Sequence, residues 1–199
     1  MADVFACCTF FHNIGPEELR RAYEENAEPA NGYLIDLHEG WWGLLDATAT
    51  EAGDWARQLE LATELTGDDA LALSLFIVGE HWAVAFTHGG ERGPVAVYVP
   101  DDRKVLERLP HELLGLERVL AESFSDEIDP DELDALFGAV VDGATPIEEA
   151  FAEICTMLRI APDWLRWSWY ETIPEQLFTD PDLAPRVLPL GDVKGLWEE

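Results

Sequence analysis

Three short apolar runs, separated by glycine-containing turns, constrain the fold more than any other part of the sequence. They cover residues 71–78, 82–87 and 94–99, and β-branched or aromatic residues recur in each of them. Gly79 begins the first turn, and the second turn contains three glycines. Because tight turns of this kind join antiparallel neighbours, the region predicts three consecutive antiparallel strands.

Further strands are indicated in the first part of the chain. The run DVFACCTFF at residues 3–11 is apolar at almost every position, which is typical of a central strand buried on both faces. Residues 33–38 and 41–46 flank Glu39 and Gly40 and predict a hairpin. We therefore expect six strands, all in one sheet.

Helices are predicted between and after these strands. A helix begins near Pro16, where proline and acidic residues occupy the first turn, and another covers residues 51–66. Leucines and Phe124 form an apolar stripe over residues 109–124. Two more helices begin near Pro130 and Pro146, each preceded by a capping residue.

The order of elements predicts an α+β fold with a mostly antiparallel sheet, β-α-ββ-α-βββ, packed by helices. Residues 1–100 form the sheet, residues 101–199 are mainly helical, and residues 1–199 make a single domain. Within the second half, residues 164–171 alternate well enough to predict a strand. The proline-rich tail from Pro174 is expected to wrap irregularly over the surface.

This order of elements resembles a group of bacterial α+β proteins of about this size that have no established function. The segments that carry the likeness are WAVAFTHGGERGPVAVYVPDD, at residues 82–102, and WSWYE, at residues 167–171. The resemblance covers residues 1–102 and, more loosely, 146–171. It implies the fold and no particular chemistry.

The charge of the chain excludes several classes of function. There are 41 acidic residues against 12 Lys and Arg, which gives a net charge of -29. Such a charge repels nucleic acids and anionic membranes, so we expect neither as a partner. It favours a basic protein partner and accelerates the encounter with it. Solubility and adaptation to high salt are the alternative explanations.

The compartment is indicated by the first residues and by the cysteines. The N-terminus lacks a basic segment followed by an apolar run, and no apolar stretch reaches the roughly 20 residues of a membrane span. Cys7, Cys8 and Cys155 are odd in number and have no framework spacing. We therefore expect buried, reduced thiols in a cytoplasmic protein.

The sequence contains no motif of an enzyme, a metal site or a cofactor site. His111 and Glu112 match the first two residues of the zincin motif H-E-x-x-H, but Gly115 occupies the position of the second histidine. Nucleophile elbows, Cys-x-x-Cys pairs, EF-hand spacing and phosphate-binding loops are also missing. Cys7, His12 and His38 would converge on a metal only if their strands were neighbours, and we favour the alternative of a buried thiol with two imidazoles near loops.

A site without a motif is the alternative to a binding module. The hairpin turns contain His38-Glu39 and Glu80-His81. If the two hairpins face each other, these side chains form an acid–base cluster. Otherwise they are solvated turn residues.

One interval is a candidate surface for a basic partner. Between Arg118 and Arg159 there is no Lys or Arg. Two amphipathic helices in this interval would turn their acidic residues outward. The alternative is a solvated face, with acids placed where the helix dipole favours them. The candidate acidic partner residues are Asp126, Glu127, Asp129, Asp131, Glu132, Asp134, Glu148 and Glu149.

Two tryptophans complete the candidate surface. Trp41 and Trp42 are adjacent on a predicted strand and must point to opposite faces. An exposed Trp41 or Trp82 beside acidic groups would suit a binding hot spot for a basic protein. The alternative is that the C-terminal helices cover them.

Overall fold

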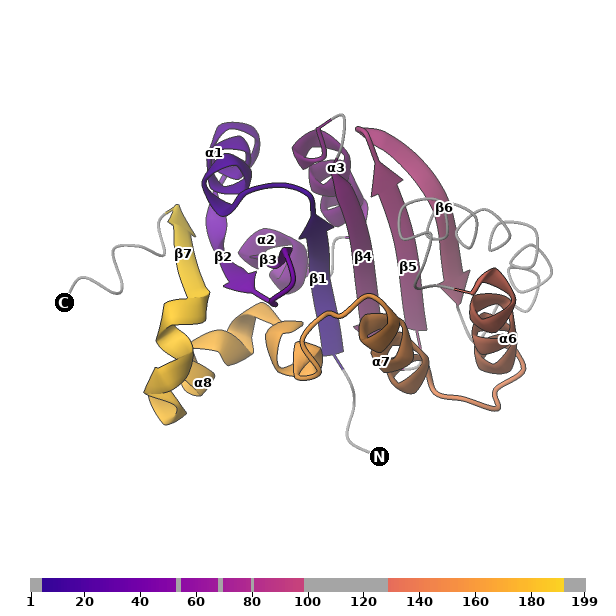
Figure 1. The fold of residues 1–199 in the computed structure, drawn as a ribbon. Helices are drawn as coiled ribbons and strands as arrows, with labels where there is room; N and C mark the ends of the chain where they lie inside the picture. The colour runs from indigo at the N-terminus through magenta and orange to yellow at the C-terminus, as the bar shows by residue number, and fades with distance from the viewer. Residues whose placement is uncertain (1–4, 53–54, 68–69, 80, 99–128, 192–199) are drawn as a thin grey trace.

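The fold is built on one antiparallel sheet. The computed structural model describes residues 5–52, 55–67, 70–79, 81–98 and 129–191. Its strands are β1 (Phe5–His12), β2 (Asn31–Asp36), β3 (Trp41–Asp46), β4 (Leu71–Val78), β5 (His81–His88), β6 (Glu91–Tyr98) and β7 (Val187–Gly191). They form a seven-stranded sheet in the order β6-β5-β4-β1-β3-β2-β7 (Figure 1).

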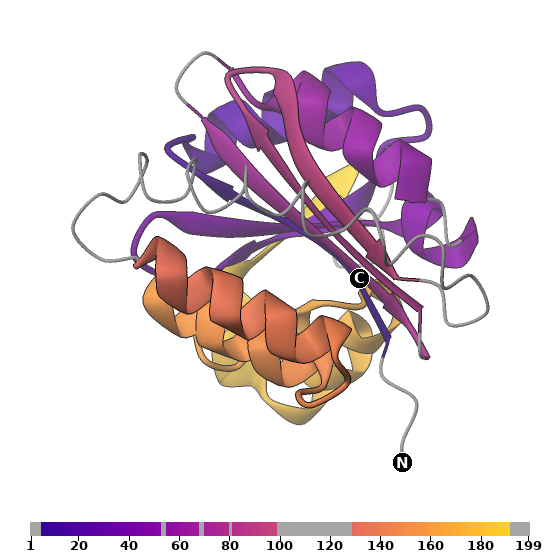
Figure 2. The same ribbon diagram turned by 90° about the vertical axis from the view of Figure 1, so that its right-hand side faces the viewer.

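Helices cover both faces of this sheet (Figure 2). On one face lie α1 (Pro16–Asn26) and α3 (Trp55–Leu65), with the short helix α2 (Ala47–Ala52) directly after β3. The other face is covered by C-terminal elements, three α-helices and three short 3₁₀ helices: α6 (Pro130–Val141), α7 (Ile147–Met157), η1 (Trp164–Trp167), η2 (Tyr170–Thr172), α8 (Ile173–Thr179) and η3 (Pro181–Arg186). The strands therefore contact apolar side chains on both sides.

The side chains of β1 point alternately into two separate hydrophobic cores, one on each face of the sheet. Ala6, Cys8 and Phe10 point to the core under the C-terminal helices. Phe11 points to the core under α1 and α3, and the Cys7 thiol also lies toward α3, where it donates to Gln58 Oε1 at 3.2 Å. A continuous apolar run is the pattern that such a doubly covered strand requires.

The antiparallel α+β fold is the one expected from the sequence, and all six expected strands are in one sheet. The seventh strand, β7, was not expected. It forms where the tail was predicted to be irregular, and it pairs with β2, Leu188 opposite Leu34. Val187 and Leu190 are buried in the two different cores, so the alternation of a strand is present in these few residues.

The prediction of a strand over residues 164–171 is wrong. These residues form η1 and η2 instead. Trp164 and Trp167 are both buried, and residues three apart share a face of a 3₁₀ helix. The turn is also useful to the sheet, since the Ser168 carbonyl accepts from Cys7 N at 2.6 Å. This hydrogen bond gives the Cys7 N–H an acceptor at a position that β3 does not reach, because β3 pairs only with residues 9–12 of β1.

The helix predicted over residues 51–66 contains α3 (Trp55–Leu65), and a further short helix, α2 (Ala47–Ala52), precedes α3. The first, α2, begins at Ala47 because Asp46 lies just before it and accepts a hydrogen bond from Ala49 N at 2.7 Å. The second, α3, begins at Trp55. The apolar stripe at residues 109–124 lies outside the described residues.

Candidate interaction surface and hairpin turns

The helices α6 and α7 pack against each other and against the sheet. Val140 of α6 is buried, and Leu136 packs partly buried against the same core. The inward face of α7 consists of Ile147, Ala150, Phe151, Ile154 and Cys155. Because these apolar residues turn inward, Asp131 and Glu132 of α6 and Glu149 and Glu153 of α7 are left on the outer side.

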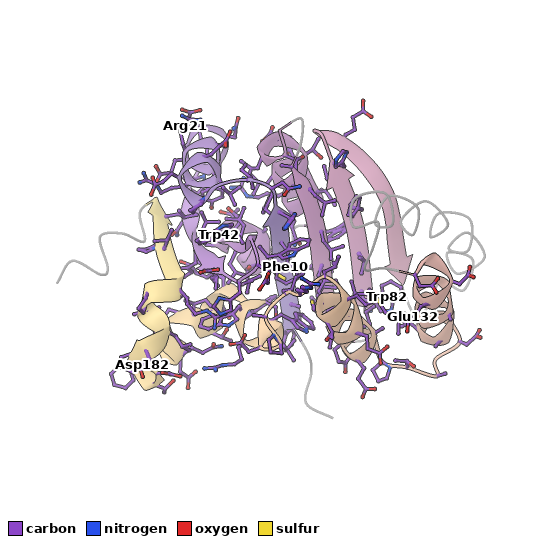
Figure 3. All side chains as sticks on the ribbon, in the orientation of Figure 1. Phe10, Arg21, Trp42, Trp82, Glu132 and Asp182 are labelled. Atoms are coloured by element: carbon purple, nitrogen blue, oxygen red, sulfur yellow. The ribbon has the colours of Figure 1, made fainter. Side chains whose placement is uncertain are left out.

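The structure places most of the candidate acidic residues on this outer side. Asp129, Asp131, Glu132 and Glu149 are exposed, and Glu148 is half-buried. Asp134 lies in α6, whereas Asp126 and Glu127 lie outside the described residues. Figure 3 shows Glu132 at the end of the helical layer beneath β6.

Part of this acidity has a structural explanation. Asp129 is the N-cap of α6, and its carboxylate accepts from Asp131 N at 3.0 Å. Asp131 and Glu132 occupy the first turn of α6, and Glu148 and Glu149 that of α7, where the helix dipole favours negative charge. Asp142, at the end of α6, and Glu153, in the middle of α7, are exposed and have no such explanation.

Trp41 and Trp82 are not on this surface, which corrects the prediction that they contact a partner. Both are buried in the core beneath the C-terminal helices, and Trp41 Nε1 donates to the Leu158 carbonyl at 2.9 Å. Its neighbour Trp42 points the other way and is half-buried against the second core. The alternative in which C-terminal helices cover these rings is therefore the one that the structure shows.

The two hairpin turns lie at opposite ends of the sheet. Along β1, His12 pairs with Trp41 beside the β2–β3 turn, whereas Phe5 pairs with Val78 just before the β4–β5 turn. A strand of this length separates its ends by roughly 20 Å. Glu39 and His81 therefore do not meet, so the condition on which an acid–base cluster at the two hairpins depended is not fulfilled.

The β2–β3 turn has an unusual backbone. Trp41 N donates to the His38 carbonyl at 2.9 Å, and the intervening Glu39 and Gly40 have φ of 48° and 82°. Positive φ at both central positions is the geometry of a type I′ turn. His38 also has a positive φ, of 66°, and its N–H is held by Asp36 Oδ1 at 2.8 Å. A non-glycine residue in the left-handed backbone conformation costs about 1–2 kcal/mol of folding free energy.

All four non-glycine residues with positive φ in the described part of the chain lie at this end of the sheet. Besides His38 and Glu39 they are Asn13 and Arg159. Asn13 follows His12, the pairing partner of Trp41. Arg159 follows Leu158, whose carbonyl accepts from the Trp41 indole. Strained backbone is therefore concentrated around Trp41, where the hairpin meets the end of α7.

His12 is the titratable group at the centre of this region. Its ring lies 4.8 Å from that of Trp41, centroid to centroid, and a Cβ at Gly40 would lie 3.5 Å from Nε2. Burial lowers the pKa of His12 below its ordinary value near 6.5, although a hydrogen bond to the Glu39 backbone acts in the opposite direction. The neutral imidazole is therefore favoured in the folded protein.

We predict that His12 makes the folded protein less stable as the pH falls below 6.5. A depressed pKa means that the unfolded chain binds the proton first, so the stabilising contribution is complete above pH 6.5 and is lost as the pH falls through the lower folded-state value. Urea unfolding between pH 5 and pH 7.5 measures this. His12→Gln should flatten the decline, and His88→Gln, at an exposed position, should leave it unchanged. Identical profiles for wild type and His12→Gln would contradict the prediction.

No metal site is present among the residues that the structure describes: no group of three or more His, Cys, Asp or Glu side chains is arranged to hold an ion. Cys7 lies toward α3, whereas His12 lies beside Trp41 on the opposite face of the sheet, so these residues do not converge. The three cysteines are free and buried, as predicted. Burial raises the pKa of Cys8 and of Cys155 well above the ordinary value, which makes these thiols poor nucleophiles.

Buried polar side chains form two clusters that sequence reasoning missed. Asp46 accepts from Tyr23 Oη at 2.6 Å and from Arg57 Nε at 2.9 Å. Under α3, Gln58 donates to the carbonyls of Cys8 and of Leu75, the latter at 3.1 Å. Both clusters are closed by protein partners and hold helices to the sheet, so they are structural.

Comparisons with known proteins found no match for this chain among protein-family models, curated proteins or solved structures. The resemblance to a group of bacterial α+β proteins therefore stays a prediction. Among the helices that are described, none is long and apolar enough to cross a membrane.

Proposed function

We propose that this protein is a non-catalytic interaction module, of the inhibitor or immunity type, that binds a basic protein through the outer faces of α6 and α7. The observation that carries the proposal is the pairing of buried apolar faces with exposed carboxylates on two consecutive helices. No Lys or Arg stands between Arg118 and Arg159 to neutralise them. A surface of one sign attracts partners of the other sign.

The dipole explanation covers only part of this surface. It accounts for the first-turn acids, but it does not account for Asp142 and Glu153, which lie away from helix N-termini. Carboxylates at these positions repel their neighbours without helping the helices. A basic partner would relieve that repulsion, and so would salt. This is why binding has to be tested directly and not inferred from stabilisation by salt.

We also propose that the module acts in the cytoplasm. The three cysteines are buried and form no disulfide among the described residues, which is compatible with a reducing compartment. The basic partner would then be an intracellular protein or a toxin that reaches the cytoplasm.

The test compares two triple variants that remove the same number of charges. Asp131→Asn with Glu132→Gln and Glu149→Gln neutralises the proposed surface, and Glu18→Gln with Glu25→Gln and Glu28→Gln neutralises exposed acids around α1. Tagged proteins are cross-linked and purified from the native host, and the affinity of the recovered basic protein is then measured in purified form. We expect the first variant to lose about tenfold or more in affinity, because complementary charges are removed.

The α1 variant should keep the affinity of the wild type. If the α6–α7 variant also keeps it, the acidic face is only a solvated one, and acidity serves solubility or adaptation to salt. If both variants lose affinity equally, the interaction depends on net charge and not on this surface. Circular dichroism at each step checks that the helices remain folded.

A further inference from the structure

An exposed phenylalanine on α8 is not explained by the fold. Phe178 is 88% exposed, the most exposed large apolar side chain among the described residues. The other apolar residues of this helix, Ile173 and Leu177, are buried one turn apart on its inner face. Phe178 is rotated about 100° from Leu177, and it therefore points away from the core. A polar residue would serve the helix equally well at this position.

Three acidic residues lie close to Phe178 along the chain, at positions 175, 180 and 182. Glu175 precedes it by one helical turn and is exposed, so the two side chains are neighbours on the helix surface. Asp180 is the C-cap of α8, and Asp182 is exposed in η3, which packs against α8. Negative charge at a helix C-terminus opposes the helix dipole. Asp180 therefore does not stabilise α8, whereas Glu175 lies in the first turn of α8, where the dipole favours it.

The basic residues nearby have other contacts. Arg186, at the end of η3, donates to Asp163 Oδ2 at 3.3 Å and to the Asp36 carbonyl at 3.0 Å. Arg166 lies over the Trp167 ring. The flank of α8 that faces η1 is closed by Gln176, which donates to the Arg166 carbonyl at 2.6 Å. Phe178 lies on the other flank, because residues 176 and 178 are about 200° apart around the helix.

We propose that this corner, formed by Phe178, Glu175, Asp180 and Asp182, binds an arginine side chain of a basic protein partner. A guanidinium is flat and weakly hydrated, so it can stack on an aromatic ring while its N–H groups pair with carboxylates. Lysine has a compact, strongly hydrated charge and fits such a site less well. A second copy of this chain is disfavoured because each copy carries a charge of -29.

The arginine site is separate from the surface on α6 and α7. Figure 3 shows Asp182 and Glu132 at opposite ends of the helical layer. The proposal shares with the proposed function only the expectation that the partner is basic. Partner binding at α6 and α7 and arginine binding at α8 can therefore fail independently.

The experiment measures the affinity of an arginine–glycine repeat peptide by fluorescence anisotropy, beside a lysine–glycine peptide of equal length. The wild type should bind the arginine peptide more tightly. Phe178→Ala should weaken that binding about 5–30-fold, the range expected when a hot-spot side chain is truncated. Glu175→Gln with Asp182→Asn should weaken it as well and reduce its dependence on salt. Leu165→Ala, at another exposed apolar position, should change nothing.

Several results would overturn the arginine site. These are unchanged binding by Phe178→Ala, equal affinity for the two peptides, or no binding of the arginine peptide to the wild type. Loss of binding only in the α6–α7 triple variant would refute the site at α8 while supporting the proposed function. Because Phe178 is exposed, its variant should melt at the wild-type temperature, and sedimentation should show no change of mass. A change of mass would identify a second copy as the occupant instead.

Discussion

Replacing Asp46 by alanine is expected to lower the free energy of unfolding by about 3–5 kcal/mol, the usual result of removing one partner from a buried ion pair. Asp46 is 5% exposed. It pairs with Arg57, which reaches it with Nε at 2.9 Å and Nη2 at 3.2 Å. The Tyr23 hydroxyl and Ala49 N also donate to its carboxylate. Removal of the carboxylate would leave these donors without their acceptor.

The size of the effect follows from what Asp46 joins. Tyr23 belongs to α1, Arg57 to α3, and Asp46 itself lies at the junction of β3 and α2. Arg57 Nη2 also donates to the Pro29 carbonyl at 3.3 Å, so the loop before β2 depends on the same cluster. One carboxylate therefore fixes several elements of the layer that covers this face of the sheet.

Urea unfolding at neutral pH measures the free energy of unfolding that Asp46→Ala loses. Glu60→Ala is the matched control, because Glu60 is an exposed carboxylate on α3 and its removal should change the free energy of unfolding by less than about 0.5 kcal/mol. Tyr23→Phe should fall between the two, since it removes a single hydroxyl. A loss of less than 1 kcal/mol for Asp46→Ala would show that water replaces the missing carboxylate and that the cluster contributes little.

The strands and helices with local signals could be predicted from the sequence. Apolar runs and glycine turns identified β4, β5 and β6 within a few residues. A proline at the first position marked α1 and α6. The elements that were missed depend on distant partners. The strand β7 contains Pro189, which reads as a strand breaker, and it is a strand because β2 is available as its neighbour at the sheet edge.

In the candidate site, too, local features could be predicted from the sequence and features that depend on distant residues could not. Exposure of Asp131, Glu132 and Glu149 follows from helical periodicity, a local property. Burial of Trp41 depends on Leu158, far along the chain, and no local pattern contains that information. The separation of the two hairpin turns required the strand order. Phe178 was overlooked because the tail from Pro174 was expected to be irregular, and no helix was predicted that would give this side chain an orientation.

Replacing Phe151 by alanine is the second change expected to have a large effect, again about 3–5 kcal/mol of unfolding free energy. Phe151 is fully buried on α7, and its ring lies 5.7 Å from that of Phe10 and 4.9 Å from that of Trp164. The substitution removes a large side chain from a packed core and leaves a cavity. It also removes one aromatic contact between the C-terminal helices and the central strand, and leaves that of Phe10 with Trp164.

The same variant tests whether the chain is one cooperative domain. Residues of both halves share the core beneath the C-terminal helices, so loss of Phe151 should destabilise the sheet together with α7. We expect one transition in urea, shifted to lower concentration, with near-ultraviolet and far-ultraviolet circular dichroism coinciding. Phe178→Ala is the control, since it removes the same side chain from an exposed position. If the sheet amides kept their wild-type hydrogen-exchange protection while the C-terminal helices melted early, the two halves would be independent domains, and the helices would be a separable layer placed on a sheet that is stable without them.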